Sequence, residues 1–162
     1  MTATTEEFVA RYGGIYEHSS WVAETAARHV SAGDKVDDIA RVMADCVDKA
    51  ALDQQLELIR AHPDLAGKAQ IAGELTADST TEQASAGLDC CTADEYEKFQ
   101  SLNTAYHDKF GFPFVMAVRD RSRAEILTAF EQRLDNDEAT EFETALAEIH
   151  KIAWLRLQAM ES

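Results

Sequence analysis

The stretch from Thr92 to Phe110, TADEYEKFQSLNTAYHDKF, shows the pattern that decides the fold class. It opens with Thr92-x-x-Glu95, the capping-box spacing in which side chains and backbone satisfy each other's hydrogen bonds in a first helical turn. Large apolar side chains then recur at helical spacing, at Phe99, Leu102, Tyr106 and Phe110. Together, the two signals predict an amphipathic helix over this stretch.

The same signals recur along the rest of the chain. Capping-box spacings also begin at Thr4, Ser79 and Ser122. Alternating Val/Ile/Thr runs and Asn-Gly or Asp-Gly hairpin turns, which indicate strands, are absent from the sequence. We therefore predict an all-α protein, a single-domain bundle of about eight helices over residues 1–162. The helices are expected at 5–12, 20–31, 36–60, 66–74, 80–86, 93–109, 123–135 and 137–160.

The charge balance excludes some classes of partner. The chain carries 15 Lys and Arg against 30 Asp and Glu, a formal net charge of −15. Nucleic acid and anionic membranes would be repelled, so we expect neither as a partner. A small anionic ligand would need a local cation. No apolar run is long enough to span a bilayer and no signal-peptide pattern opens the chain, which favours a cytoplasmic protein.

The cysteines and histidines give no metal or redox motif. Three cysteines, Cys46, Cys90 and Cys91, lack C-x-x-C spacing and are interpreted as reduced thiols. Cys46 lies on an apolar helical stripe and is predicted to be in the core. The pair Cys90–Cys91 has no evident basic neighbour and is expected to be inert. Four histidines without metal-like spacing are expected to be structural or on the surface: His18, His29, His107 and His150.

The two prolines mark segments where the helical pattern breaks. Pro63 biases His62 away from the helical region, so His62 is expected just after a helix end. It either projects its imidazole into a cleft or follows a plain helix stop. In the second segment, three phenylalanines alternate around Gly111 and Pro113 over residues 110–114. That segment either offers free backbone groups to a flat, amide-rich heterocycle or plugs the core.

Two further features allow a structural and a functional interpretation. Arg156 lies on the apolar face of the last predicted helix, where an arginine must find a counter-charge or reach solvent. It either forms an internal ion pair or waits for the carboxylate of a ligand. The spacing of Ser79 and Glu82 matches a capping box, but a helix N-terminus at this place could also bind an anion.

Taken in order, these segments resemble the family of 2-oxo-4-hydroxy-4-carboxy-5-ureidoimidazoline (OHCU) decarboxylases of purine catabolism, over about residues 16 to 160. The resemblance rests on SWVAE at 20–24, RAHPDLAGK at 60–68, S-x-x-EQA at 79–84, KFGFPF at 109–114 and KIA-x-LRL at 151–157. Two positions depart from the family pattern. Ser20 replaces the proline that usually precedes the tryptophan, and Asp120 stands where the family tends to have glycine.

The resemblance implies an all-α fold, often dimeric, that needs no metal or organic cofactor. The implied reaction converts OHCU to (S)-allantoin, the last step from urate to allantoin. By position, His62 and Glu82 match the catalytic residues, while the acid or base role of His62 stays open. The positions that match substrate contacts are Pro63, Ser79, Gln83, Phe114, Val115, Met116 and Arg156.

Two other functions remain open on the sequence. A helical interaction module would bind a basic partner through its acidic surface and would keep His62 and Arg156 apart. A hydrolase of a related ureide would need an activated nucleophile, for which only Cys90 or Cys91 is available. Serine substitution of both cysteines would be harmless to a decarboxylase.

Overall fold

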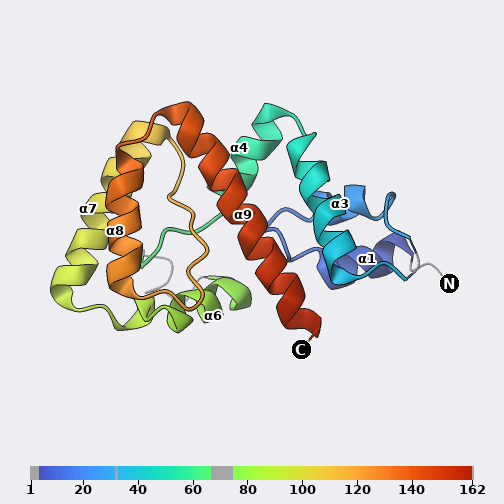
Figure 1. The fold of residues 1–162 in the computed structure, drawn as a ribbon, viewed down its shortest axis with the longest axis horizontal. Helices are drawn as coiled ribbons and strands as arrows, with labels where there is room; N and C mark the ends of the chain where they lie inside the picture. The colour runs from blue at the N-terminus through green and yellow to red at the C-terminus, as the bar shows by residue number, and fades with distance from the viewer. Residues whose placement is uncertain (1–3, 32, 67–74, 162) are drawn as a thin grey trace. The chain divides into compact units, whose positions relative to one another are not determined.

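The computed structural model describes residues 4–31, 33–66 and 75–161, and within these ranges it contains eight α-helices, a short 3-10 helix and no strand. The predicted all-α class is therefore confirmed. The helices are α1 Thr5–Tyr12, α2 Trp21–Ala26, α3 Val36–Asp48, α4 Leu52–Arg60, α6 Ala77–Ser85, η1 Leu88–Cys90, α7 Ala93–Phe110, α8 Arg123–Leu134 and α9 Glu138–Glu161 (Figure 1).

Three of the predicted capping boxes are present, each at the N-terminus of a helix. Thr92 Oγ1 accepts a hydrogen bond from the Glu95 N–H at 3.1 Å, and Glu95 Oε1 accepts one from the Thr92 N–H at 2.9 Å. The same reciprocal pair is present at Thr4 before α1 and at Ser122 before α8. Local side-chain chemistry therefore sets these helix starts.

The predicted capping box at Ser79 is wrong. Helix α6 begins at Ala77, and its N-cap is Thr76, whose Oγ1 accepts a hydrogen bond from the Ser79 N–H at 3.2 Å. Ser79 lies inside the helix and only 4% of its surface is exposed. Because the helix begins earlier, with Thr76 as its N-cap, the side chain of Ser79 is not needed as a cap.

The predicted helix over 36–60 is two helices, α3 and α4. Ala51 is extended, with φ −62° and ψ 151°, and so interrupts the helical path. Gln55 Nε2 donates to the carbonyl oxygens of Val47 and Asp48, at 2.9 and 3.3 Å. Because this side chain satisfies carbonyls at the end of α3, the break leaves fewer polar groups unpaired.

Two other predicted helices also differ from the structure. The segment expected to be helical over 20–31 is helical only over Trp21–Ala26. Turns follow it, with hydrogen bonds between residues three apart, such as the bond from the His29 N–H to the Ala26 carbonyl at 2.9 Å. Of the helix expected over 66–74, Ala66 has φ +51° and is not helical. Residues 67–74 lie outside the described residues.

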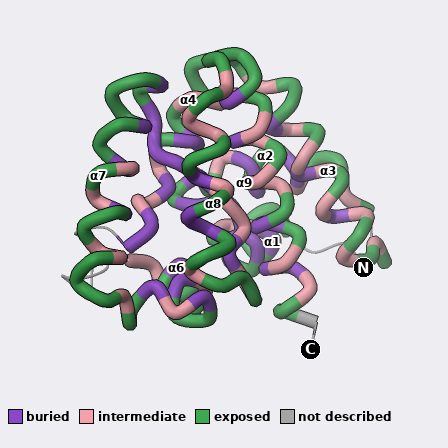
Figure 2. Tube along the Cα trace, turned by 60° about the vertical axis from the view of Figure 1, so that its left-hand side comes forward, coloured by how far each residue is buried: buried purple, intermediate pink, exposed green. Residues whose placement is uncertain are grey.

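The chain divides into two compact units. The N-terminal unit comprises Met1–Ala61 with Ile149–Ser162, and the central unit comprises His62–Glu148. Helix α9 contributes its first part to the central unit and its last part to the N-terminal unit. Along the helices, buried residues recur every three or four positions with exposed residues between them, as expected for helices that bury one face (Figure 2).

Each unit has its own apolar core. In the N-terminal unit α2 packs against α1 and α3, and fully buried side chains include Val22, Met43 and Val47. In the central unit α7 and α8 lie side by side (Figure 1), and their core is aromatic. Tyr106 makes edge contacts with Phe112, Phe114 and Phe130.

The N-terminal unit also holds a partly buried polar contact made by His150. The Tyr16 hydroxyl oxygen lies 2.8 Å from His150 Nδ1, and burial raises the pKa of Tyr16. The Nε2 atom of His150 then lies 3.1 Å from the carboxylate of Asp48. His150 is therefore structural, as predicted.

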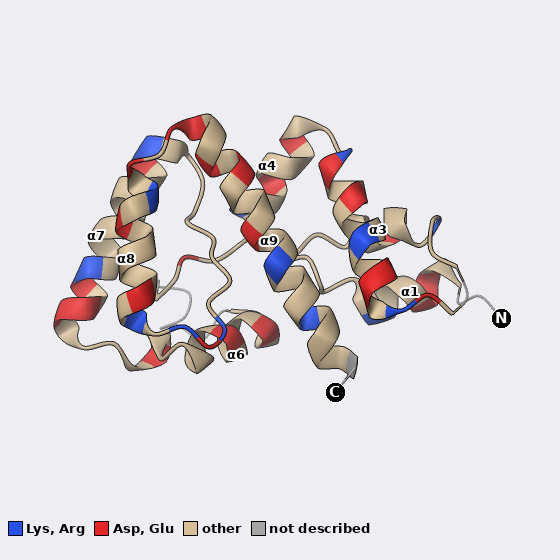
Figure 3. Ribbon diagram, viewed as in Figure 1, with Lys and Arg blue, Asp and Glu red and all other residues tan. Residues whose placement is uncertain are grey.

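Acidic residues occur on every labelled helix of Figure 3, and they far outnumber the Lys and Arg residues. Among the residues that the structure describes, no helix combines the length and the apolar character that crossing a membrane requires.

Candidate active site

His62 opens the central unit in a non-helical segment. Helix α4 ends at Arg60, and the chain from Ala61 to Ala66 follows as turns and irregular backbone, so the predicted helix end before Pro63 is confirmed. His62 is only 7% exposed, Leu65 and Ala66 are buried, and Pro63 is partly buried. A buried segment of this kind needs partners for its backbone N–H and C=O groups.

Gln83 of α6 supplies two of these partners. Its Oε1 accepts a hydrogen bond from the Ala66 N–H at 3.0 Å, and its Nε2 donates to the Asp64 carbonyl at 3.3 Å. Gln83 is 2% exposed, and Ser79, one helical turn earlier, is 4% exposed, so both lie on the buried face of α6. Glu82 lies between them and is partly exposed.

Helix α7 supplies two further partners and one side-chain contact. Asn103 Nδ2 donates to the Leu65 carbonyl at 3.1 Å, and Gln100 Nε2 donates to the Ala66 carbonyl at 2.7 Å. His107 lies 2.8 Å from the carboxylate of Asp64. Sequence reasoning missed the roles of Gln100 and Asn103, whereas His107 is exposed, in agreement with the prediction that it is structural or on the surface. The available signal was Asn103, a polar residue on the same face of the helix as Phe99 and Tyr106.

The second non-helical segment follows α7. That helix ends at Phe110, and its C-cap is Gly111, whose φ of +76° is the left-handed conformation that glycine adopts readily. The chain then runs without regular structure to Val118, with Phe112, Phe114 and Val115 buried and Met116 partly buried. Phe114 stacks on Phe130 of α8 with ring centroids 3.9 Å apart.

Both interpretations of this segment agree with the structure. Phe110, Phe112 and Phe114 contact Tyr106 and fill the core. In the described part of the chain, the N–H groups of Phe114, Val115 and Met116 also make no hydrogen bond. The aromatic plug therefore leaves unpaired backbone donors beside it, as a ligand site would require.

A buried ion pair supports the segment from α8 and α9. Arg133 Nη1 donates to the Val115 carbonyl at 2.6 Å, and Arg133 Nε donates to Glu141 Oε1 at 2.8 Å. Glu141 is completely buried and also accepts hydrogen bonds from Tyr106 at 2.6 Å and Asn136 at 3.0 Å. Burial, and then the bond to Glu141, raises the pKa of Tyr106, which therefore remains a hydroxyl donor.

Two buried side-chain atoms lack a hydrogen-bond partner among the described residues. They are Asn103 Oδ1 and Arg133 Nη2. Asn103 holds the segment that follows His62, and Arg133 holds the segment that follows Phe114. The two unpaired atoms thus belong to side chains that support the two predicted substrate-contact segments.

Arg156 lies in the N-terminal unit. Its Nη2 atom is 2.9 Å from Glu17 Oε2, and both side chains are almost fully buried. Its Nη1 atom donates to the carbonyls of Ile15 at 3.2 Å and Gly14 at 3.4 Å. The internal ion pair that the sequence allowed is therefore present, and it fixes the guanidinium in place.

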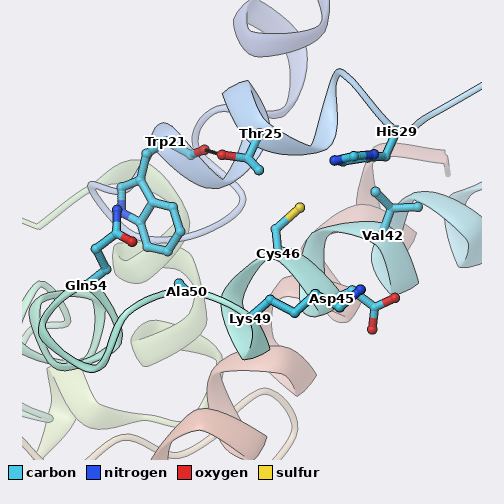
Figure 4. A pocket seen from close by; sticks show the side chains of 9 residues that line it. All are labelled: Trp21, Thr25, His29, Val42, Asp45, Cys46, Lys49, Ala50 and Gln54. Carbon is cyan, nitrogen blue, oxygen red and sulfur yellow. Dashed lines mark hydrogen bonds between the residues drawn. The ribbon is translucent and has the colours of Figure 1, made fainter.

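A hollow of about 470 Å³ in the N-terminal unit contains none of the predicted site residues (Figure 4). It is lined by Trp21, Thr25, His29, Val42, Asp45, Cys46, Lys49, Ala50 and Gln54. Cys46 is partly exposed at this hollow, so its predicted place in the core is wrong. The cysteine lies at the edge of the apolar stripe of α3, whose buried residues are Ile39, Met43 and Val47.

The remaining thiols have little thiolate character. A hydrogen bond with Asp89 raises the pKa of Cys90, and burial raises the pKa of Cys91. Both effects disfavour the nucleophilic form at neutral pH. Within the ranges that the structure describes, no three His, Cys, Asp or Glu side chains are grouped to hold a metal ion.

Comparison with known proteins gives one consistent result. The family model for OHCU decarboxylase matches residues 1–158. The 2-oxo-4-hydroxy-4-carboxy-5-ureidoimidazoline decarboxylase of Haloferax volcanii is 49% identical over 152 residues, which cover 94% of this chain and 88% of that protein. The uric acid degradation bifunctional protein of a Bacillus strain, TB-90, is 43% identical, over 96% of this chain but 30% of its own length.

The solved structures agree. The crystal structure of an (S)-allantoin synthase superposes with a TM-score of 0.77 at 36% identity, covering 97% of this chain and 50% of that chain. A crystal structure of OHCU decarboxylase in the presence of (S)-allantoin superposes with a TM-score of 0.74 over 98% of both chains, and its 23% identity supports the fold alone. The fold and the family match define an all-α protein of the carboxy-lyase class. The chain belongs to the OHCU decarboxylase family.

Proposed function

We propose that this chain decarboxylates OHCU to (S)-allantoin, the last step in the conversion of urate to allantoin. One observation carries the proposal: His62, Ser79 and Gln83, which match site positions of the family, are all buried polar residues of the central unit. The identity of 49% to a named OHCU decarboxylase supports the choice of substrate.

The chemistry of OHCU suits a protein that supplies only positioning and proton control. When the bond from ring carbon 4 to the carboxylate breaks, CO₂ leaves and its electron pair moves into the adjacent ring imine. The imine nitrogen gains a proton and a double bond forms between carbons 4 and 5, which gives an enol. The hydroxyl on carbon 4 then loses its proton as that carbon becomes a carbonyl, and carbon 5 gains a proton, so the carboxylate form of the substrate takes up one proton from water overall. Because the substrate is its own electron sink, the proposed reaction uses no metal or organic cofactor.

We assign the polar residues of the central unit to orientation and proton transfer. His62 hydrogen-bonds near the carboxylated carbon, helps the carboxylate rotate out of the ring plane and directs the proton to one face, which yields the S enantiomer. Glu82 acts with it, and Glu82, Gln83 and Ser79 hold the hydroxyl and ureido groups. The contacts of Gln83 with Asp64 and Ala66 support this assignment, because they connect α6 to the segment that follows His62.

The remaining predicted residues shape the site and attract the substrate. Pro63 and Phe114 form apolar walls, and backbone groups of Val115 and Met116 meet the ring. The unpaired N–H groups of residues 114–116 support this role. Arg156 contributes positive charge for the anionic substrate, and its bonds to Glu17 and Ile15 hold the guanidinium in one orientation.

The test generates OHCU from urate in situ with urate oxidase and hydroxyisourate hydrolase and follows circular dichroism after the protein is added. We expect fast appearance of a lasting signal with the sign of (S)-allantoin. Decay at the spontaneous rate, with an optically inactive product, would favour the interaction module instead.

The variant His62→Asn should lower kcat by about 10²–10⁴-fold, the usual contribution of a positioned acid or base. His29→Asn is the matched control, because His29 is exposed and lines the hollow of the N-terminal unit. Turnover near that of the wild type in His62→Asn would remove His62 from the chemistry.

We also propose that residues 1–162 act as one domain and that the protein is a cytoplasmic homodimer. Family membership over residues 1–158 supports the single domain. Sedimentation equilibrium gives the oligomeric state, and a monomer across the micromolar range would exclude the dimer.

A further inference from the structure

Two side chains clamp the backbone on either side of Met116. Arg133 Nη1 donates to the Val115 carbonyl at 2.6 Å, and Glu148 Oε1 accepts a hydrogen bond from the Ala117 N–H at 3.2 Å. Within the part of the chain that the structure describes, the backbone from Phe114 to Ala117 makes no other hydrogen bond.

These two hydrogen bonds, together with the planarity of the peptide, set the directions in which the Met116 N–H and C=O groups point. A trans peptide is planar, so its C=O and N–H groups point in opposite directions, and the described residues contain no cis peptide. The bond to the Val115 carbonyl therefore aims the Met116 N–H away from Arg133. In the next peptide, the bond from the Ala117 N–H aims the Met116 C=O away from Glu148. One residue thus offers both an unpaired donor and an unpaired acceptor.

A donor and an acceptor on one residue suit a particular kind of ligand group. A cyclic amide or a ureido group carries an N–H beside a C=O, so it can pair with both atoms of Met116 at once. The proposed substrate contains such groups. We propose that Arg133 and Glu148 are positioning residues that aim the Met116 N–H and C=O at an amide edge of the substrate. This inference rests on the proposed function.

Arg133 is built to hold one orientation. Its Nε atom is tied to Glu141 at 2.8 Å, and its guanidinium lies 4.3 Å from the centre of the Phe114 ring. Glu141 is in turn fixed by Tyr106 and Asn136. A positioning group acts well when its own rotamer is locked by such a second set of contacts.

The experiment compares Arg133→Lys with Arg123→Lys. Lysine keeps the positive charge that Glu141 needs but cannot donate to Glu141 and Val115 in the same planar fork. Arg123 is a matched control in the same unit, because it also donates to a carboxylate, Glu95, at 3.0 Å and to a backbone carbonyl, Gly87, at 2.9 Å.

We expect Arg133→Lys to raise KM for OHCU about tenfold and to change kcat by less than about threefold, since the amide contact is made equally in the ground and transition states. Arg123→Lys should leave both constants within about twofold of the wild type, because none of its contacts is at the site. A KM in Arg133→Lys that matches the control would overturn the inference.

A second pair of variants decides the matter if Arg133→Lys does not fold. Glu148→Ala removes the acceptor of the Ala117 N–H and should raise KM several-fold, whereas Glu148→Gln keeps an acceptor oxygen and should restore it. Equal KM values in the two variants would overturn the inference. An inactive wild-type protein would contradict the proposed function instead, so the two failures are distinguishable.

Discussion

Replacement of Glu141 by glutamine should strongly destabilise the protein. Glu141 is completely buried and accepts hydrogen bonds from Tyr106 at 2.6 Å, Arg133 at 2.8 Å and Asn136 at 3.0 Å. Glutamine has nearly the same shape, but it carries no charge and replaces one acceptor oxygen with an NH₂ donor. In the variant, Arg133 would stay buried without its counter-charge, and at least one donor would face another donor.

The size of the loss follows from the burial. Removal of one partner of a buried ion pair costs about 3–5 kcal/mol, because the remaining charge is left uncompensated. Arg133 keeps its bond to the Val115 carbonyl and is 12% exposed, which favours the lower end of that range. For a chain of this length each kcal/mol lowers Tm by about 2–4 °C, so we expect a drop of roughly 6–12 °C.

The assay is urea unfolding followed by far-ultraviolet circular dichroism, with thermal melts in parallel. Glu131→Gln is the control, because Glu131 pairs with Lys98 at 2.6 Å while both side chains are about half exposed. An exposed pair contributes about 0–1 kcal/mol, so the control should melt close to the wild type. Equal losses of stability in the two variants would refute the argument from burial.

The remaining predictions concern the second buried ion pair and the helix caps. Arg156→Leu should lose about 3–5 kcal/mol in urea unfolding, because Glu17 is left without its partner at 2.9 Å. The double variant Glu17→Leu/Arg156→Leu should recover stability but not the KM for OHCU, and a single variant as stable as the wild type would contradict this. The protein should also become less stable as the pH is lowered past about 4.5, because hydrogen bonds from the N-cap backbone lower the pKa of Glu95 and Glu125 from the usual 4.5. A carboxyl group whose pKa is lower in the folded state than in the unfolded state stabilises the folded protein at pH values above its unfolded pKa. This contribution is lost as the pH falls through the folded pKa. Thermal melts from pH 7 to pH 3 check the direction, and a Tm that rises on acidification would show the opposite sign.

Much of the helical structure could be predicted because its causes are local. The capping boxes at Thr4, Thr92 and Ser122 lie within four residues of the helix starts that they set. The apolar spacing from Phe99 to Phe110 identified the buried face of α7 for the same reason. A local signal gave a wrong prediction where a second residue of a suitable type lies nearby. At Ser79 the predicted cap is wrong because Thr76 is the N-cap and α6 begins earlier.

The candidate site could be predicted in part. Pro63 and Pro113 marked the two non-helical segments, and the ordered motifs indicated which residues in them matter. The spacing could not show that Gln83, Gln100 and Asn103 hold the backbone after His62, because these contacts join positions 17 to 38 residues apart. Hydrogen bonds over such separations leave no periodic trace in the sequence.

The sequence by itself determined the all-α class, several helix starts and the family to which the chain belongs, since these depend on neighbouring residues or on ordered motifs. Only the tertiary structure decided which oppositely charged side chains form buried ion pairs. Glu17 and Arg156 are 139 residues apart, and nothing local to either shows that they form an ion pair. Nothing in the sequence distinguishes Arg133 from other helical cations, and only the fold places its guanidinium against Glu141 and the Val115 carbonyl. A charge can be buried only where a partner arrives from elsewhere in the chain, and that is a property of packing.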